Sequence, residues 1–153
     1  MRLTTFTNYA LRTLMYAAMK GDDLSRAQEI ADAYGVSRAH MNKCIHHLGA
    51  WGYLRNVRGR SGGFHLARPA HQITVGEIVR RTEDSLELVE CFNDQTNTCP
   101  LISMCRLSRT FKRAMARFMD ELDGVTIADL VRNREALWPL LHQDERIPEP
   151  ADS

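Results

Sequence analysis

Three cysteines within fifteen residues are the part of this sequence best suited to chemistry. Cys91, Cys99 and Cys105 lie on a polar stretch, with seven and then five residues between them. Thiolates are soft ligands, which favour zinc, copper(I) or an iron–sulfur cluster. Structural zinc usually uses Cys pairs two to four residues apart and a fourth Cys or His, but no His lies between His71 and His142. An iron–sulfur cluster fits the wider spacing better, because the loop must wrap around irons at separate corners.

Two other interpretations of the cysteines stay open, namely three unrelated thiols or a disulfide. The compartment bears on this choice. No apolar run approaches the roughly 20 residues needed to span a bilayer, and the sequence opens with no signal peptide. We therefore expect a cytoplasmic protein without a membrane segment. Thiols stay reduced there, so clustered cysteines favour metal or redox chemistry.

The elements that must position these cysteines belong to a chain with uneven charge. Of its 153 residues, 44% are hydrophobic and 25% are charged, which is typical of one soluble globular domain or one with a small extension. Residues 1–70 carry 10 Lys or Arg against 4 Asp or Glu, whereas residues 71–153 carry 10 against 15. Residues 33–70 contain no acid at all. This asymmetry predicts a polyanion-binding module joined to an acidic one.

The basic half has the pattern of consecutive helices. Apolar residues recur at helical spacing over 7–20, and Thr7 is in position to cap that helix. Ser25 followed by Gln28 predicts a capping box for a second helix that ends before Gly35. A glycine there allows a tight turn, so a third helix can follow at once.

Ser37 is expected to cap this third helix, over 38–48, in which Met41, Ile45 and Leu48 face inward. Two helices joined by a glycine turn form a helix-turn-helix, and its second helix can enter the major groove of DNA. The outward positions offer donors for base edges and phosphates. They are Arg38, Ala39, His40, Asn42, Lys43 and His46.

A basic β-hairpin is predicted next. Two alternating runs, 53–58 and 63–67, are joined by a glycine-rich turn. A hairpin directly after a helix-turn-helix forms a wing, which reaches phosphates or the minor groove. A phosphate-binding glycine loop is the competing interpretation, but no helix start follows and no Gly-Lys-Ser/Thr occurs. The predicted wing contacts are Arg58, Arg60, Gly62 and Gly63.

Two further helices flank the cysteines. Thr74 and Glu77 predict a short capped helix before them, and an amphipathic helix follows over 106–122. Its apolar stripe can pack on its own domain or form a dimer seam, since helix-turn-helix proteins generally bind paired half-sites as dimers. The stripe comprises Leu107, Phe111, Ala114, Met115, Phe118 and Leu122.

Together these features resemble the Rrf-two family of winged-helix regulators, from residue 1 to about residue 133. Within the family, the sequences around Cys91 and Cys99 are most similar to the iron-regulator branch, RirA, and residues 34–41 are equally similar to the nitric-oxide-sensing branch, NsrR. The resemblance rests on the Met1-Arg2-Leu3-Thr4 start, Tyr34-Gly35-Val36-Ser37, the run from Val57 to Gly63, Arg81-Thr82-Glu83-Asp84-Ser85, and the three cysteines.

The resemblance implies a homodimer with one iron–sulfur cluster per subunit, of the 4Fe-4S type, held by Cys91, Cys99 and Cys105. It also implies that the helix after the cluster forms the dimer interface. The fourth ligand departs from the family pattern. The NsrR branch takes a carboxylate from the first helix of the partner subunit, and this sequence has Asn8 there. An amide oxygen is a poorer donor to iron than a carboxylate, so this corner of the cluster is expected to be labile.

We therefore predict a mainly α fold with a small β-hairpin wing. A winged helix-turn-helix domain (1–70) precedes the cluster loop and dimerisation helix (71–133), and a C-terminal tail (134–153) is expected to be disordered from residue 147. The predicted function is a repressor that binds double-stranded DNA and senses iron or cluster status. A nitric-oxide-sensing repressor and a metal-free thiol switch are the alternatives. An enzyme or electron carrier is disfavoured, because no catalytic constellation stands out and a ferredoxin-like carrier needs four cysteine ligands.

Overall fold

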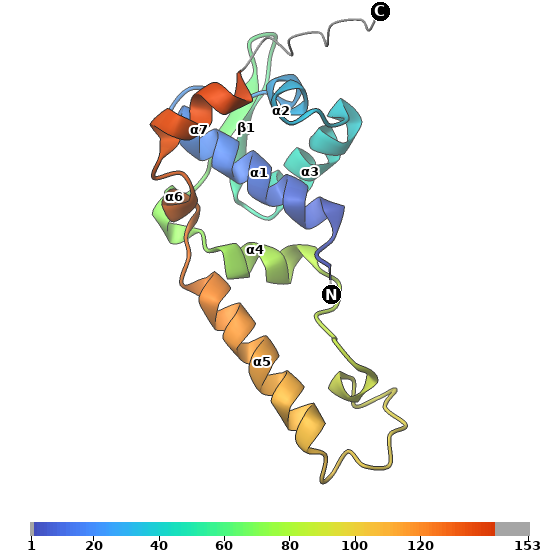
Figure 1. Cartoon of the computed structure of the whole chain (residues 1–153). Coiled ribbons are helices and arrows are strands. Elements are labelled where there is room, and N and C mark those ends of the chain that lie inside the picture. The colour runs from blue at the N-terminus through green and yellow to red at the C-terminus, as the bar shows by residue number, and fades with distance from the viewer. Residues whose placement is uncertain (1, 143–153) are drawn as a thin grey trace, which may run out of the picture.

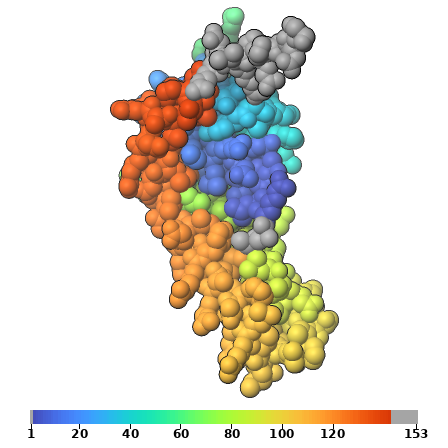
Figure 2. Space-filling model, in the orientation of Figure 1, coloured from blue at the N-terminus to red at the C-terminus, as the bar shows by residue number. Residues whose placement is uncertain are grey.

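The computed structural model describes residues 2–142, which form two parts (Figures 1 and 2). The body comprises residues 2–83 and 124–142. The arm, residues 84–123, projects from it as one long helix beside an irregular loop. The elements in chain order are α1 (Thr5–Lys20), α2 (Ala27–Tyr34), α3 (Arg38–Ala50), β1 (Leu54–Val57), β2 (Gly63–Leu66), the short 3₁₀ helix η1 (Ala70–Gln72), α4 (Val75–Thr82), the 3₁₀ helix η2 (Glu90–Phe92), α5 (Arg106–Asp123), α6 (Ile127–Leu130) and α7 (Arg134–Leu141).

Helix α1 lies at the centre of the body. Its Ala10, Leu14 and Ala17 are at most 1% exposed, and the helix contacts α3, α4, α6 and β2. Of these three, Leu14 is the large one, and burying a side chain of its size contributes about 1.5–3 kcal/mol relative to exposure. The elements that carry the predicted DNA contacts are thus held by one core.

The first two helix starts differ from the sequence prediction. Thr4, not Thr7, caps α1, since its Oγ1 accepts the Thr7 N–H at 3.2 Å. The cap of α2 is Arg26, whose N–H donates to Glu29 Oε2 at 3.1 Å. The predicted Ser25–Gln28 capping box was wrong because Ser25 is used elsewhere.

The backbone of Ser25 pairs with the wing instead of opening α2. Its N–H donates to the Phe64 carbonyl at 2.8 Å, and the Phe64 N–H donates back to the Ser25 carbonyl at 2.9 Å. Phe64 itself is 2% exposed. The Ser25 N–H, which a capping box would direct to the side chain three residues on, is therefore already bonded to Phe64.

The helix-turn-helix and wing form as predicted. Gly35 ends α2 in the left-handed conformation (φ 62°), so α3 follows after a tight turn. Ser37 occupies the cap position of α3 without a capping hydrogen bond from its side chain. Strands β1 and β2 pair antiparallel, with Leu54 opposite Leu66 and Val57 opposite Gly63.

Helix α4 joins the body to the arm. Toward the arm, its Val75 and Val79 pack with Met119 of α5. The Arg80 guanidinium also donates to both carboxylate oxygens of Asp123, each at 2.6 Å. Such bidentate pairs fix relative orientation as well as adding energy. The C-terminal half of α5 is therefore anchored on the body.

The region predicted as a C-terminal tail begins with helix α7, which packs on the body. Trp138 lies against Tyr16 of α1, with ring centroids 5.4 Å apart, and Tyr16 OH is 3.3 Å from His142 Nε2. This burial raises the pKa of Tyr16 to about 12. The disorder predicted from residue 147 lies outside the described residues.

Candidate DNA-binding surface and cysteine site

The outward face of α3 is available for DNA. Met41, Cys44, Ile45 and Leu48 are buried, as their spacing indicated, with Leu48 at 0% exposure. Every predicted contact on this helix is exposed in the single chain. These residues are Arg38, Ala39, His40, Asn42 and Lys43, together with His46.

No acidic side chain belongs to α3, so its exposed face is cationic or neutral throughout. One of its residues is already engaged: the His40 ring stacks on Tyr9 of α1, with centroids 6.0 Å apart. Cys44, on the opposite face, has a thiol whose pKa burial raises to about 11. It is a buried thiol, as expected from its place among core positions.

The wing presents its tip to solvent. Arg58 and Arg60 are exposed. The two glycines have packing reasons of their own, because a Cβ on Gly62 would lie 2.4 Å from the Val57 carbonyl oxygen and one on Gly63 would lie 2.5 Å from that of Ser25. The structure therefore explains both glycines by close backbone approach, and their contact with DNA stays a prediction.

The three clustered cysteines lie in the arm, around the loop that precedes α5. All are free thiols of intermediate exposure. Cys91 is in η2, Cys99 follows a turn, and Cys105 caps α5, where its Sγ accepts the Ser108 N–H at 3.3 Å. Arg109 Nε donates to the Cys105 carbonyl at 3.4 Å, which ties the loop end to the helix.

The donor set of this loop fits an iron–sulfur cluster. Three soft thiols lie on a segment of turns, free of disulfides, and soft thiolates are the ligands of such clusters. Within residues 2–142 the structure brings no three Cys, His, Asp or Glu side chains close enough to hold a metal ion. The loop must therefore close for its three sulfurs to share one group.

Asn8 lies in the first turn of α1 and is exposed. Figure 1 shows that the N-terminal end of α1 lies beside α4, while the cysteine loop is at the far end of the arm. The structure thus does not bring Asn8 to the cysteines of its own chain. A contact through a partner subunit stays a prediction.

Two polar contacts that join elements of the body were not predicted from the sequence. Glu77 of α4 accepts from Tyr53 OH at 2.9 Å and from Arg68 at 2.6 Å, which joins α4 to the wing. Burial by itself raises the pKa of Glu77, but these hydrogen bonds outweigh it and hold the pKa below its usual value. The sequence feature that could have indicated this contact was the acid-free run to residue 70, followed by a single Glu at the start of α4.

The second such contact is at Glu83, which follows α4. Its Oε1 accepts from the Thr4 N–H at 2.7 Å and from the Thr7 hydroxyl. Burial by itself raises the pKa of Glu83, but these bonds outweigh it and lower the pKa. The base of the arm is thereby tied to the turn of α1 that contains Asn8.

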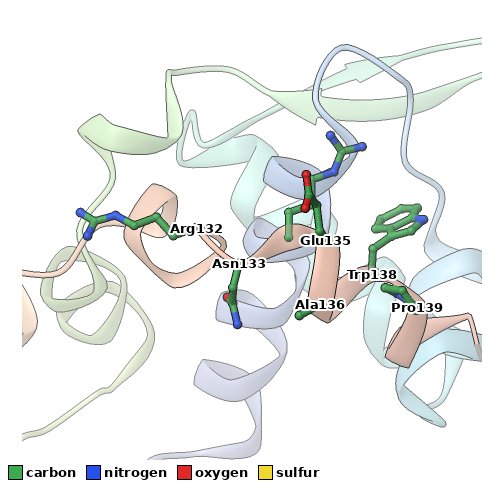
Figure 3. A pocket seen from close by; sticks show the side chains of 7 residues that line it. Arg132, Asn133, Glu135, Ala136, Trp138 and Pro139 are labelled. Carbon is green, nitrogen blue, oxygen red and sulfur yellow. The ribbon is translucent and has the colours of Figure 1, made fainter.

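A surface hollow over α7 and the two residues before it contains none of the predicted site residues. Figure 3 shows that its lining comes from one continuous segment, residues 132–139, including Trp138 and Pro139. A search of residues 2–142 for a helix long and apolar enough to cross a membrane finds none.

Comparison with known proteins identifies relatives along most of the chain. Residues 3–133 match the model of the Rrf2 family, described as iron-dependent transcriptional regulator. The HTH-type transcriptional regulator NsrR of Shouchella clausii is 44% identical over 142 residues, which cover 92% of this chain and 95% of that protein.

Solved structures share the fold. The T. potens IscR structure has a TM-score of 0.71 at 24% identity and covers 90% of each chain. The oxidized form of Staphylococcus aureus CymR has a TM-score of 0.68 at 25% identity, over 85% of this chain and 95% of that one. This chain therefore has the same overall fold as both structures.

Proposed function

Because the chain belongs to the Rrf2 family of transcriptional regulators, we propose that it is a DNA-binding repressor controlled by an iron–sulfur cluster that reports iron or cluster status. One observation carries the proposal. Helix α3 is exposed on one face and acid-free, and we call it the reading helix because it would enter the major groove. It occurs in one chain with three free thiols, in two parts that α4 and α5 join. A regulator needs both a DNA-binding surface and a separate site that changes with the signal.

We assign Cys91, Cys99 and Cys105 as the residues that would hold one cluster per subunit, of the 4Fe-4S type. When bound, such a cluster supplies a centre whose iron content and charge respond to iron supply and to oxidants. The protein residues contribute the rest. Ser108 N–H and Arg109 fix the position of Cys105 at the start of α5, and Arg80 with Asp123 fixes the other end of that helix.

A second copy of the chain is part of the proposal. The apolar stripe of α5 is covered by α4 only near its C-terminal end, around Met119. Leu107 at the other end is 61% exposed, and the neighbouring Met104 is 79% exposed. Burial of such a patch in a symmetric dimer would pair two reading helices for adjacent half-sites about 34 Å apart.

Asn8 is the proposed fourth ligand, reaching the loop of the partner subunit. Its exposure in the first turn of α1 leaves its amide free for such a contact, and Glu83 holds that turn at the base of the arm. If the contact forms, loss of an iron would release α1 and allow the spacing of the reading helices to change. A differential affinity of a few kcal/mol between the two spacings is enough for a switch.

A second candidate function uses the same site to sense nitric oxide. It is favoured by the 44% identity to a regulator named NsrR. A third is a thiol switch without metal, for which the oxidized form of CymR provides a structural precedent at 25% identity. All three candidates share the DNA-binding surface and differ in what happens at the cysteines.

The deciding experiment is iron and sulfide analysis of anaerobically purified protein, with operator binding measured on the same samples. We expect a brown protein absorbing near 400 nm in the wild type, and loss of iron when Cys91, Cys99 or Cys105 is changed to Ala. Cys44→Ala is the matched control and should retain iron. Colourless wild type whose DNA binding responds to thiol oxidants would favour the thiol switch instead.

The role of Asn8 has its own test in the rate of cluster loss to a chelator. Asn8→Asp should slow the loss, because a carboxylate binds iron more strongly than an amide, and Asn8→Ala should speed it. Equal rates in the three proteins would remove Asn8 from the site. The rate of cluster loss after addition of nitric oxide, compared with the rate after addition of chelator alone, separates the first two candidate functions.

A further inference from the structure

The wing needs support from outside itself, because an isolated two-stranded hairpin is marginally stable. At its base, the Ser25–Phe64 backbone bridge and the buried side chains of Leu54 and Phe64 supply that support. The tip, residues 58–62, extends beyond this base and carries the predicted phosphate contacts Arg58 and Arg60.

One side chain from outside the hairpin reaches the tip. In the described chain, Arg26 Nε donates to the Gly62 carbonyl at 3.2 Å, and no other hydrogen bond joins residues 58–62 to another element. Gly62 allows the turn to be this tight, and Gly63 allows the Ser25 backbone to come close. Arg26 is therefore held next to the carbonyl it binds.

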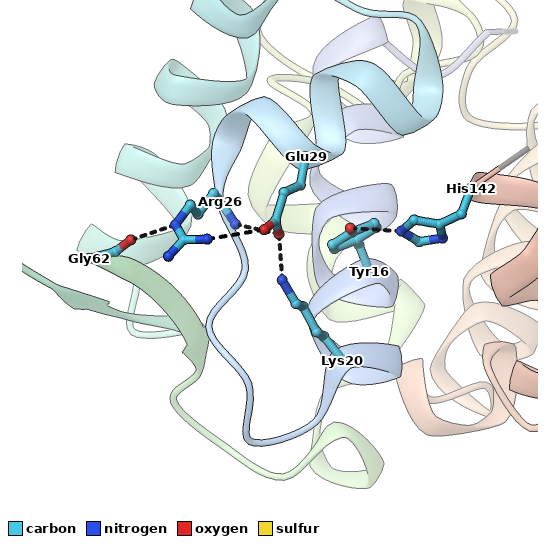
Figure 4. A network of polar contacts seen from close by, with 6 residues as sticks. All are labelled: Tyr16, Lys20, Arg26, Glu29, Gly62 and His142. Carbon is cyan, nitrogen blue, oxygen red and sulfur yellow. Dashed lines mark hydrogen bonds and ion pairs between the residues drawn. The ribbon is translucent and has the colours of Figure 1, made fainter. Parts of the chain in front are cut away.

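The Arg26 guanidinium is itself oriented by a chain of charges, which Figure 4 shows. Glu29 accepts from the Arg26 N–H at 3.1 Å and pairs with its guanidinium at 3.4 Å. Lys20 at the end of α1 donates to the same carboxylate at 2.6 Å, and both side chains are less than a third exposed. The chain Lys20–Glu29–Arg26–Gly62 thus runs from α1, through the start of α2, to the wing tip.

We propose that Arg26 is a positioning residue for DNA binding, which fixes the wing tip on the helix-turn-helix so that Arg58 and Arg60 meet phosphates without first being ordered. Ordering a flexible segment at the moment of binding lowers affinity, and a segment held beforehand avoids that cost. The proposal rests on the DNA-binding function and adds a residue that acts through the Gly62 carbonyl. A direct contact of Arg26 with phosphate is the competing explanation, since its side chain is 52% exposed.

The first test needs no DNA. Amide hydrogen exchange of residues 58–62 should be faster in Arg26→Ala than in wild type, because the tip loses its outside hydrogen bond. Arg132→Ala removes the same charge from a side chain 81% exposed near α6 and should leave the exchange unchanged. Unchanged exchange in Arg26→Ala would overturn the proposal, even if the protein bound no DNA.

The second test is a double-mutant cycle on a random-sequence duplex of about 40 base pairs, which reports phosphate contacts independently of the operator. Arg26→Ala should weaken binding about three- to tenfold, because the wing tip with Arg58 and Arg60 would then have to be ordered at the moment of binding. In an Arg58→Ala, Arg60→Ala background the same change should have almost no effect. An equal loss in both backgrounds would make Arg26 a direct contact and overturn the positioning role.

Glu29→Gln gives a third test, because the two explanations predict opposite changes in DNA affinity. Removing a negative charge near a DNA-binding surface strengthens binding if only charge matters. If Glu29 orients Arg26, the same substitution should weaken binding and speed exchange at the wing tip. Stronger binding with unchanged exchange would contradict the proposal.

Discussion

The body and the arm differ in how much of their geometry a single chain determines. Within the arm, residues 84–123, only Ser108 and Met119 are buried. The body contains a continuous core of α1, α2, α3, the hairpin, α4 and α6. A buried side chain has its position fixed by six to twelve neighbours, whereas an exposed one is held by few. Helix α3 is thus preformed, while core packing does not fix the arrangement of the three clustered cysteines.

This difference suits a regulator. A DNA-reading surface must hold donors in place, and core packing does that without a ligand. A sensing site must exist in two arrangements, and a sparsely packed loop can close or open at low cost. Helix α4 joins the two parts. Its Arg80 pairs with Asp123 and its Val79 packs on Met119 of the arm, while its Glu77 binds the residues that flank the wing.

The largest expected contrast is thiol reactivity. Since burial raises the pKa of Cys44 to about 11, only about one molecule in a thousand carries its thiolate at pH 8. We expect iodoacetamide to alkylate Cys91, Cys99 and Cys105 in native, iron-free protein and Cys44 only after unfolding. Mass spectrometry of the labelled peptides measures this. Rapid labelling of Cys44 in the native protein would show that the body opens as readily as the arm.

A matched pair of leucines tests the packing contrast. Leu48 on α3 is 0% exposed and Leu101 in the arm is 67% exposed. Leu48→Ala should lower the free energy of unfolding by about 2–5 kcal/mol, because burial is reduced and a cavity is left. Leu101→Ala should change it by less than about 0.5 kcal/mol. Denaturant titrations of both variants measure the difference, and similar losses would mean that the arm is packed in the free protein.

A third prediction separates the cations of the body from those of the arm. Arg60→Ala should reduce the salt slope of DNA binding by about 0.9 for each phosphate that the side chain no longer neutralises. Asn42→Ala should instead change base preference, by about 1–3 kcal/mol for a good bidentate contact.

The arm supplies the control for this prediction. Arg113, on the exposed face of α5, belongs to a basic cluster with Arg106, Arg109 and Lys112. Arg113→Ala should leave the slope unchanged. A slope that falls for Arg113→Ala but not for Arg60→Ala would move the DNA contact to the arm.

The smallest effect concerns the pH dependence of the body. The pKa of Glu77 is below its ordinary value of 4.5, so its contribution to stability is present above that pH and is lost as the pH falls through the folded-state value. Glu77→Gln should lower Tm slightly at pH 7, and the difference from wild type should shrink in acid. Glu121→Gln, exposed on α5, is the control and should leave Tm unchanged. A difference that grows in acid would contradict the assignment.

The sequence by itself determined the local structure. Apolar spacing identified the inward residues of α3, glycines marked the turn at Gly35 and the wing, and the span of α5 was predicted to within one residue. These features depend on backbone propensity and on periodic burial, which neighbouring residues encode. The thiol of Cys44 was assigned to the core for the same reason.

The tertiary structure alone decided which polar residues meet across the chain. Ser25 pairs with Phe64 rather than capping α2, and Glu77 and Glu83 connect α4 to the wing and to α1. Residues 134–141, predicted as part of a tail, form a helix on α1 because the Trp138 ring packs against Tyr16. A hydrogen bond between residues distant in sequence depends on the whole packing arrangement, and no local pattern carries that information.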